Sequence, residues 1–142
     1  GLVTRANPEL CDTLLGGGFL PVVACAAGDR EGRLYNVNAD QMAVACAAAC
    51  GAQQLIFLTD VEGVLDGERR LVPQLTSAHS AALISLGIAT GGMQAKLKAA
   101  QDALRLGVPR VQIAAGAAER VLERIVAGEA VGTRLAAEED SA

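Results

Sequence analysis

The residues most suggestive of chemistry in the 142-residue chain follow a pair of glycines at the start of a predicted helix. Backbone N–H groups of a segment such as Thr90–Met93 (Thr-Gly-Gly-Met) can approach a phosphate at a helix start. The chain contains ten arginines but only two lysines, both in the first turns of this helix. Lys98 has a helical partner in Asp102, four residues further on, whereas Lys96 has none. An unpaired ammonium here suits the neutralisation of a transferring phosphoryl group; the alternative is a tight turn followed by a solvated lysine.

A second polar group lies in the segment Tyr35–Asp40. Asn36 and Asn38 would lie on one face if the chain is extended there, and Asp40 would then enter the first turn of a helix. Helix capping explains Asn38 and Asp40, because both residue types satisfy free backbone N–H groups at a helix start. Capping does not require a second asparagine upstream. The presence of Asn36 therefore modestly supports a ligand-binding role for the segment, beside the simple capping interpretation.

A third candidate is the loop that follows a short apolar strand. In open α/β sheets, ligands bind beyond the carboxyl ends of the strands, where loops meet helix N-termini. Thr59 is the last residue of the predicted strand Gln54–Thr59, and Asp60 leads into the loop 61–65. We expect this loop and Thr90–Met93 to form the ligand-binding edge, although a glycine pair before a helix is more often a simple turn.

The hydrophobic pattern predicts an α/β domain that positions these segments. Three apolar runs of strand length are separated by longer helical segments, and parallel strands require such crossovers. The predicted helices span Pro8–Leu15, Asn38–Cys50, Ser77–Leu86, Met93–Leu106 and Ala117–Ala127; the predicted strands span Phe19–Ala26, Gln54–Thr59 and Arg110–Ala114; and Val61–Gln74 forms a loop with a small hairpin. The expected fold is three-layer α/β/α with a mostly parallel sheet.

Composition excludes several classes of protein. An apolar share of 51% in 142 residues fits one domain with a sizeable core. A formal net charge of −4, the absence of a dense basic run and an aromatic share of 2% disfavour nucleic-acid binding. No apolar run reaches the roughly 18 residues of a membrane span, and no signal peptide opens the sequence. We expect a soluble, cytoplasmic protein with no nucleic-acid or membrane partner.

The cysteines and the single histidine do not predict a metal site. Cys11, Cys25, Cys46 and Cys50 include no Cys-x-x-Cys pair, and His79 stands alone. Cys46 and Cys50 lie one helical turn apart in an alanine-rich helix, where small core residues are a better interpretation than ligands. We expect His79 at the surface, near the start of a helix.

Four motifs, in their order and spacing, resemble a known family. They are Asn36-Val37-Asn38-Ala39-Asp40, Leu58-Thr59-Asp60-Val61-Glu62-Gly63-Val64-Leu65, Thr90-Gly91-Gly92-Met93-Gln94-Ala95-Lys96 and Val131-Gly132-Thr133-Arg134-Leu135. From about Pro8 to Leu135 the chain resembles the carboxyl-terminal, nucleotide-binding half of the acetylglutamate kinases, a branch of the amino acid kinase family. The first and third motifs favour this branch over glutamate 5-kinases, aspartokinases and uridylate kinases.

The resemblance implies phosphoryl transfer from ATP, with Mg²⁺, to the side-chain carboxylate of N-acetyl-L-glutamate in arginine biosynthesis. It gives Lys96 the stabilisation of the transition state, Asp40 the positioning of the catalytic lysines, and Asn36 with Asn38 the contacts to the amino-acid substrate. The residues that would frame the nucleotide are Thr59, Asp60, Val61, Gly63, Val64, Leu65, Ile88, Thr90, Gly91, Gly92 and Met93. Such a reaction needs positioning and charge neutralisation more than covalent help from the protein.

The resemblance also implies a half that these 142 residues do not match. Family members have an amino-terminal half with a glycine-rich phosphate loop, a second catalytic lysine and most of the acyl-substrate pocket. The run Gly16–Gly18 follows a helix and has no lysine nearby, so it is not that loop. We expect residues 1–135 to form a nucleotide-binding lobe that is inactive alone. Residues 136–142 would form a charged, frayed tail. The lobe should associate with the missing half or with itself as a homo-oligomer, because a divided sheet exposes an edge strand.

Three alternatives remain open beside an acetylglutamate kinase. They are the arginine-sensing, kinase-like domain of an acetylglutamate synthase, an aminoadipate kinase of lysine synthesis, and an inactive nucleotide-binding fragment. The presence of both Asp40 and Lys96 favours a kinase over the sensing domain. Arginine-inhibited members carry a histidine and an acidic residue near the C-terminus; Glu129 fits the acidic position, but Glu119 stands where the histidine would be. One of the two residues of the arginine-inhibited pattern is therefore absent.

Overall fold

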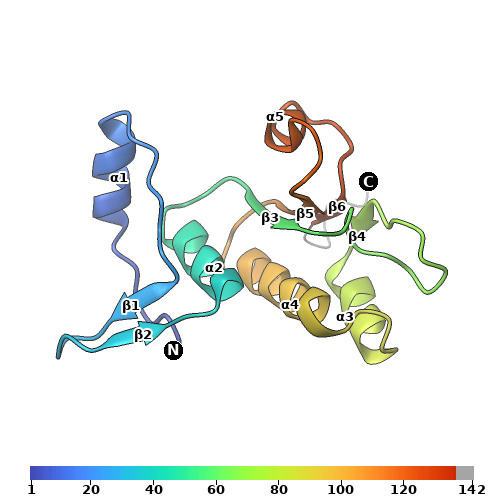
Figure 1. Ribbon diagram of the computed structural model, residues 1–142, viewed down its shortest axis with the longest axis horizontal. Helices are drawn as coiled ribbons and strands as arrows, with labels where there is room; N and C mark the ends of the chain where they lie inside the picture. Colours follow the sequence, from blue (N-terminus) through green and yellow to red (C-terminus); the bar gives the residue numbers. More distant parts are fainter. Residues whose placement is uncertain (137–142) are drawn as a thin grey trace.

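The computed structural model describes residues 1–136 of the chain (Figure 1). Its helices in this range are α1 (Pro8–Gly16), α2 (Ala39–Ala49), α3 (Ser77–Ser85), α4 (Gly91–Arg105) and α5 (Val121–Val126). Its strands are β1 (Ala26–Gly28), β2 (Leu34–Asn36), β3 (Leu55–Thr59), β4 (Gln74–Leu75), β5 (Val111–Ala115) and β6 (Thr133–Leu135). All five predicted helices are present, and four of them match the predicted bounds within two residues at each end.

A four-stranded sheet in the order β3-β5-β6-β4 forms the centre of the fold. β3 pairs with β5 and β4 with β6 in parallel, whereas β5 and β6 are antiparallel. Helices α2, α3 and α4 lie on one side of this sheet and α5 lies on the other (Figure 1). The predicted three-layer α/β/α fold with a mostly parallel sheet is therefore confirmed.

The predicted buried strand Phe19–Ala26 is wrong. Only its last residue, Ala26, enters a strand, and that strand pairs with β2 in a separate two-stranded hairpin. Leu20 is 86% exposed and Val22 is 93% exposed. A continuous apolar run has the composition of a buried strand, but within residues 1–136 no neighbouring strand or helix covers this one.

Three smaller differences concern the second half of the chain. The last helix begins at Val121 rather than Ala117, after a turn in which Arg120 adopts a left-handed conformation with φ +51°. The short strands β4 and β6 were not predicted. Ala136 is buried and its N–H donates to the carbonyl of Leu75, so the expected tail does not begin there. The rest of that tail, 137–142, lies outside the described residues.

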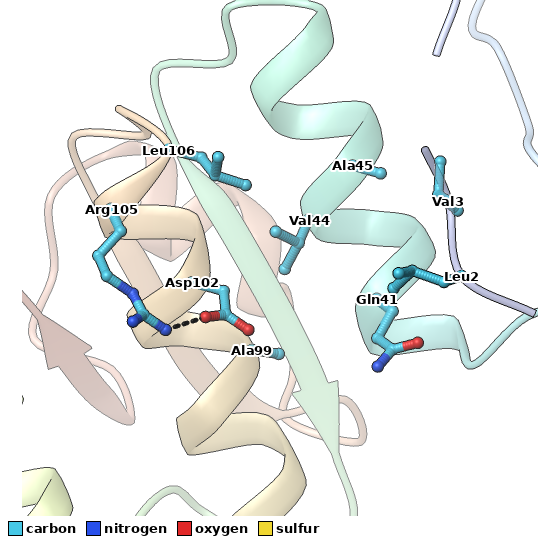
Figure 2. A pocket seen from close by; sticks show the side chains of 9 residues that line it. All are labelled: Leu2, Val3, Gln41, Val44, Ala45, Ala99, Asp102, Arg105 and Leu106. Carbon is cyan, nitrogen blue, oxygen red and sulfur yellow. Dashed lines mark hydrogen bonds and ion pairs between the residues drawn. The ribbon is translucent and has the colours of Figure 1, made fainter. Parts of the chain in front are cut away.

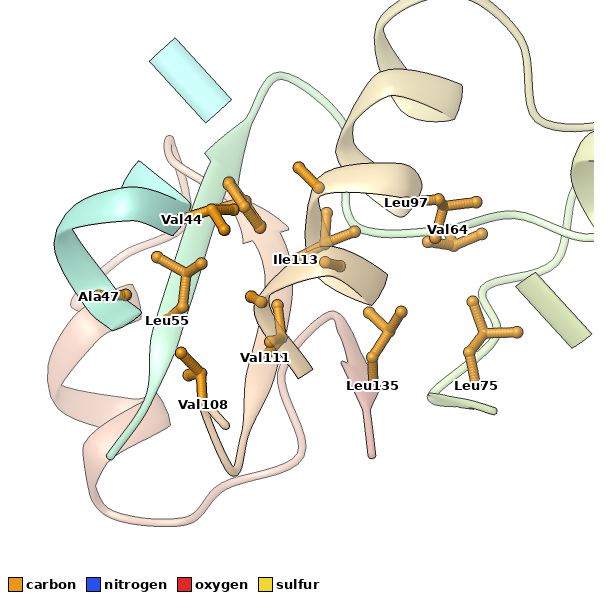
Figure 3. Close-up of a cluster of buried hydrophobic side chains, with 14 of the residues drawn as sticks. Val44, Ala47, Leu55, Val64, Leu75, Leu97, Val108, Val111, Ile113 and Leu135 are labelled. Atoms are coloured by element: carbon orange, nitrogen blue, oxygen red, sulfur yellow. The ribbon is translucent and has the colours of Figure 1, made fainter. Parts of the chain in front are cut away.

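The main core lies between α4 and the sheet (Figure 3). Leu97, Ala100 and Ala103 recur at helical spacing on α4, and each is fully buried. They pack in the same cluster as Val111 and Ile113 of β5, which are also fully buried. Burying a side chain of valine or leucine size contributes about 1.5–3 kcal/mol, so this face fixes where α4 lies on the sheet. It thereby also fixes the first turns of α4, which carry the lysines.

The thiols lie at the surface or at the junction of two helices rather than deep in the core. Cys25 is exposed, whereas Cys11 of α1 and Cys46 of α2 are half-buried, as is Cys50 at the end of α2. Interaction with the Cys11 thiol, together with burial, raises the pKa of Cys50 to about 11. Within residues 1–136, no group of three or more metal-ligating side chains could hold an ion. His79 is exposed in the first turn of α3, as predicted.

No helix among residues 1–136 is long and apolar enough to cross a membrane.

Gly132 allows β6 to approach β5 closely. It has φ +67°, and a Cβ at this position would overlap the carbonyl oxygen of Ile113. Gly128 is a matched control, since its φ is +85° but no atom lies within 4 Å of an added Cβ. We expect Gly132→Ala to lower the free energy of unfolding by at least about 3 kcal/mol and Gly128→Ala by only about 1 kcal/mol. Urea denaturation measures both values, and equal losses would contradict the close-approach explanation.

Candidate active site at the start of helices α2 and α4

Lys96 and Asp40 form an ion pair between two helices. The Lys96 Nζ lies 2.9 Å from Asp40 Oδ1 and 3.2 Å from Oδ2, and the two residues are 56 positions apart in the sequence. Their side chains are 20% and 15% exposed, so the pair is largely withdrawn from water. Breaking such a pair leaves an uncompensated charge, which makes each partner hold the other in place. The expected proximity of Lys96 and Asp40 is confirmed.

Local sequence explains why Asp40 stands at the start of α2. The Asn38 side chain accepts hydrogen bonds from the N–H groups of Asp40 and Gln41, at 3.0 and 3.2 Å. The predicted N-cap is therefore confirmed. A carboxylate in the first turn also interacts favourably with the helix dipole, so the start of α2 is a suitable position for Asp40.

Phe57 of β3 supports the same ammonium group from the sheet. The Lys96 Nζ lies 5.9 Å from the centroid of the Phe57 ring, within the range of a cation–π contact. Phe57 is buried and lies two residues before Thr59, at the carboxyl end of β3. Sequence analysis did not select Phe57. Its rarity in a chain with only two phenylalanines and one tyrosine is the only signal that could have drawn attention to it.

The glycine pair at the start of α4 is open to solvent. Gly91 has φ +53° and no atom lies within 4 Å of a Cβ added at Gly91 or Gly92. The Thr90 side chain makes no capping hydrogen bond to the helix. Gly92 lies one helical turn before Lys96, on the same face of α4. An anion placed at this helix start would therefore lie on the side of α4 that carries the Lys96 ammonium.

The carboxyl ends of β3 and β5 meet beside this region. The N–H of Gly116 donates to the carbonyl of Thr59 at 2.8 Å, which joins the two loops that leave the parallel strands. The Thr59 hydroxyl donates to the Asp60 carboxylate at 3.0 Å, and Asp60 and Val61 are exposed. This edge has the location at which α/β sheets bind ligands.

The chain after Asp60 forms a small hairpin, as predicted. Leu65 bridges to Leu71, and a Cβ added to Gly67 would lie 3.5 Å from Cδ1 of Ile88. The hairpin thus meets the segment that leads into the α4 glycines. At its turn, the Asp66 carboxylate accepts the N–H of Arg70 at 2.9 Å, and this bond holds the pKa of Asp66 below its usual value.

Other predicted site residues occupy different positions. Asn36 and Asn38 are exposed, and the Asn38 side-chain oxygen is already used for capping. Val64 is 1% exposed, and its backbone N–H and carbonyl are both bonded within the chain, so it serves packing at this position. The predicted Lys98–Asp102 pair is wrong, because Asp102 pairs instead with Arg105 on the next turn (Figure 2).

A groove between α2 and α4 is separate from the ion pair. It has a volume of about 440 Å³ and mostly apolar walls, and Figure 2 shows its lining residues. It is lined by Leu2, Val3, Gln41, Val44, Ala45, Ala99, Asp102, Arg105 and Leu106. None of the predicted catalytic, substrate-binding or nucleotide-binding residues lines it. The candidate site is therefore an open edge of the fold rather than this groove.

The fold and the site together define an α/β domain that presents a lysine–aspartate pair beside a glycine-rich helix start at the ligand edge of its sheet. Residues 1–115 match the model of the amino acid kinase family. The chain belongs to the amino acid kinase family. This confirms the resemblance found in the four sequence motifs.

Individual relatives agree with this assignment. The chain is 62% identical to an acetylglutamate kinase from Solibacter usitatus over 95% of its own length and 52% of the relative's. It is 45% identical to an acetylglutamate kinase from Actinobacillus succinogenes, again covering 52% of that protein. The chain therefore spans about half the length of these curated relatives.

A solved structure supports the fold alone. It is the N-acetylglutamate synthase from Neisseria gonorrhoeae complexed with coenzyme A and L-arginine. The match has a TM-score of 0.88 and 24% identity, and it covers 96% of this chain and 32% of that one.

Proposed function

We propose that residues 1–135 are the nucleotide-binding lobe of an acetylglutamate kinase, which transfers a phosphoryl group from ATP to the side-chain carboxylate of N-acetyl-L-glutamate. The observation that carries the proposal is the Lys96–Asp40 pair, in which Nζ and Oδ1 lie 2.9 Å apart. The 62% identity to an acetylglutamate kinase supports the choice of substrate. A kinase of a biosynthetic amino acid would work in the cytoplasm, where ATP is supplied.

In this mechanism, Lys96 neutralises charge on the transferring phosphoryl group. Asp40 and the Phe57 ring keep its ammonium in place, so little reorganisation is needed when the charge develops. The exposed backbone of Gly91 and Gly92 offers N–H groups to the nucleotide phosphates, and the loop from Thr59 to Leu65 and Ile88 flank the nucleotide. Phosphoryl transfer of this kind requires positioning and electrostatic stabilisation, with no covalent role for the protein.

The carboxylates of this lobe offer a candidate ligand for the Mg²⁺ that accompanies ATP. Mg²⁺ commonly binds one or two carboxylates together with substrate phosphates, rather than a closed protein cage. Asp60 offers an exposed carboxylate at the carboxyl end of β3, while Asp40 is engaged by Lys96. When bound, the ion would neutralise phosphate charge. Asp60 is the residue of this lobe that we expect to face it.

The acyl substrate would be bound from two sides. Asn36 and Asn38 lie at the surface beside the start of α2. Capping uses the side-chain oxygen of Asn38, but not its amide nitrogen and not the side chain of Asn36. We assign them contacts to N-acetyl-L-glutamate. The other contacts and a second catalytic lysine would come from the amino-terminal half that the relatives possess.

The test is to complete the chain. We would fuse the amino-terminal half of the Solibacter usitatus relative ahead of Gly1, which gives the completed chimera, and trap acyl phosphate with hydroxylamine. We expect ATP-dependent hydroxamate formation with N-acetyl-L-glutamate. A preference for N-acetyl-L-aminoadipate would instead indicate the lysine-pathway kinase. A folded chimera that binds arginine but forms no acyl phosphate would favour the sensing domain and overturn the proposal.

A further inference from the structure

The Thr133 hydroxyl joins both arms of the hairpin that follows Asp60. Its Oγ1 accepts the N–H of Val64 at 2.8 Å and donates to the carbonyl of Val72 at 2.7 Å. Val64 and Val72 are opposite each other, since the N–H of Val72 donates to the carbonyl of Val64 at 2.8 Å. One hydroxyl thus closes the base of the hairpin, and it comes from β6, more than 60 residues further along the chain.

Burial and close packing keep the Thr133 hydroxyl on these two partners. Thr133 is fully buried, so its hydroxyl cannot exchange these partners for water. A Cβ added to Gly63 would lie 2.7 Å from Thr133 Oγ1, so the absence of a side chain at Gly63 lets the loop close onto the threonine. Gly132, which allows β6 to approach β5, sets the position of Thr133 relative to the sheet. The carboxyl-terminal motif therefore converges with the Asp60–Leu65 loop.

The same hairpin reaches the proposed nucleotide edge. Its turn at Gly67 meets Ile88, and its first arm begins directly after Thr59 and Asp60 at the carboxyl end of β3. The loop between Asp60 and Val64 is fixed at one end by the β3 ladder and at the other by Thr133. A shift at the Val64 end would move the exposed residues Asp60 and Val61.

We propose that Thr133 is a positioning residue that sets the nucleotide-binding conformation of the Asp60–Val72 loop through Val64 and Val72. This inference rests on the proposed function. It also gives a role to the Val131–Leu135 motif, which the sequence marked without indicating what it does. Thr133 is fully buried and acts only through Val64 and Val72, so its effect should fall on nucleotide binding rather than on the chemical step.

The experiment compares isosteric variants of the completed chimera. Thr133→Val keeps the shape of the side chain and removes both hydrogen bonds, whereas Thr133→Ser keeps the hydroxyl. We expect Thr133→Val to raise the KM for ATP about tenfold or more with kcat changed by less than about threefold, and Thr133→Ser to stay near wild type. Thr13→Val is the control, because the Thr13 hydroxyl donates only to Glu9 within exposed α1.

A second measurement follows the loop itself. In the 142-residue chain, amide hydrogen exchange at Val64 should accelerate in Thr133→Val and not in Thr133→Ser or Thr13→Val. If Thr133→Val does not fold, Thr133→Cys replaces it, and its weaker donor should give an intermediate rise in KM.

The outcomes separate the two proposals. An active wild-type chimera whose KM for ATP does not change in Thr133→Val overturns this inference and leaves the proposed function intact. Equal losses in kcat and in ATP affinity also overturn it, because they indicate general disorder of the site. A folded but inactive wild-type chimera overturns the proposed function, and this inference falls with it.

Discussion

In the completed chimera, Lys96→Ala should lower kcat by about 10²–10³-fold, whereas the KM for ATP should change by less than about threefold. The lysine ammonium is the one cation of this lobe that is held beside the ligand edge by both a carboxylate and an aromatic ring. A group that neutralises charge developing only in the transition state affects turnover more than binding. Steady-state kinetics with hydroxylamine trapping measures both constants.

Lys98→Ala is the matched control for this prediction. Lys98 lies two residues further along α4, is exposed, and pairs with no carboxylate among residues 1–136. Its removal should leave kcat unchanged. Equal losses in the two variants would mean that the helix tolerates no lysine substitution, and would remove the special role of Lys96.

Asp40→Asn tests how the ammonium is held. It leaves the Lys96 charge but weakens its fixed position, so kcat should fall by at most about 10²-fold, less than in Lys96→Ala. The double variant should be no worse than Lys96→Ala alone, because Asp40 acts through the lysine. A double variant with fully additive losses would show that Asp40 has an independent role.

The sequence predicted those features of the site that depend on one continuous segment. The isolated pair of lysines after two glycines identified the start of α4, and the asparagine cap identified the start of α2, since both patterns are local. Helical spacing could not identify the partner of Lys96, because Asp40 lies 56 positions away and meets it only when α2 packs against α4. Phe57 was missed for the same reason. Its ring contact depends on where α4 crosses the sheet.

The fold shows the same limit. Helices and the strands β3 and β5 follow from hydrophobic periodicity, but β4 and β6 contain two and three residues and are too short to leave a pattern. Burial of Phe19–Ala26 was inferred from its composition. Burial depends on a neighbour, and residues 1–136 provide none.

The exposed run Phe19–Ala26 leads to a prediction about the 142-residue chain on its own. We expect it to form no acyl phosphate and to associate with itself at micromolar concentration. Its exposed apolar strip consists of Phe19, Leu20, Val22 and Val23, which are 67%, 86%, 93% and 51% exposed. Burying each such side chain contributes about 1.5–3 kcal/mol, which is enough to favour association even after its entropic cost.

The outer edge of β3 adds a second surface of the same kind. β3 is the last strand of its sheet among the described residues, so its backbone groups on that side have no strand partner there. An unpaired edge strand is a template for pairing with another chain. In a longer kinase, we propose that the amino-terminal half covers both the strip and this edge.

Variants distinguish association through this strip from non-specific aggregation. Val22→Lys places a charge in the strip and should shift the 142-residue chain toward monomer in sedimentation velocity experiments. Val126→Lys is the control, since Val126 is 77% exposed but belongs to α5 and not to the strip. Adding the separately expressed amino-terminal half should replace self-association by a one-to-one complex and restore acyl phosphate formation. A monodisperse wild-type monomer that phosphorylates N-acetyl-L-glutamate unaided would mean that residues 1–142 already contain the complete site.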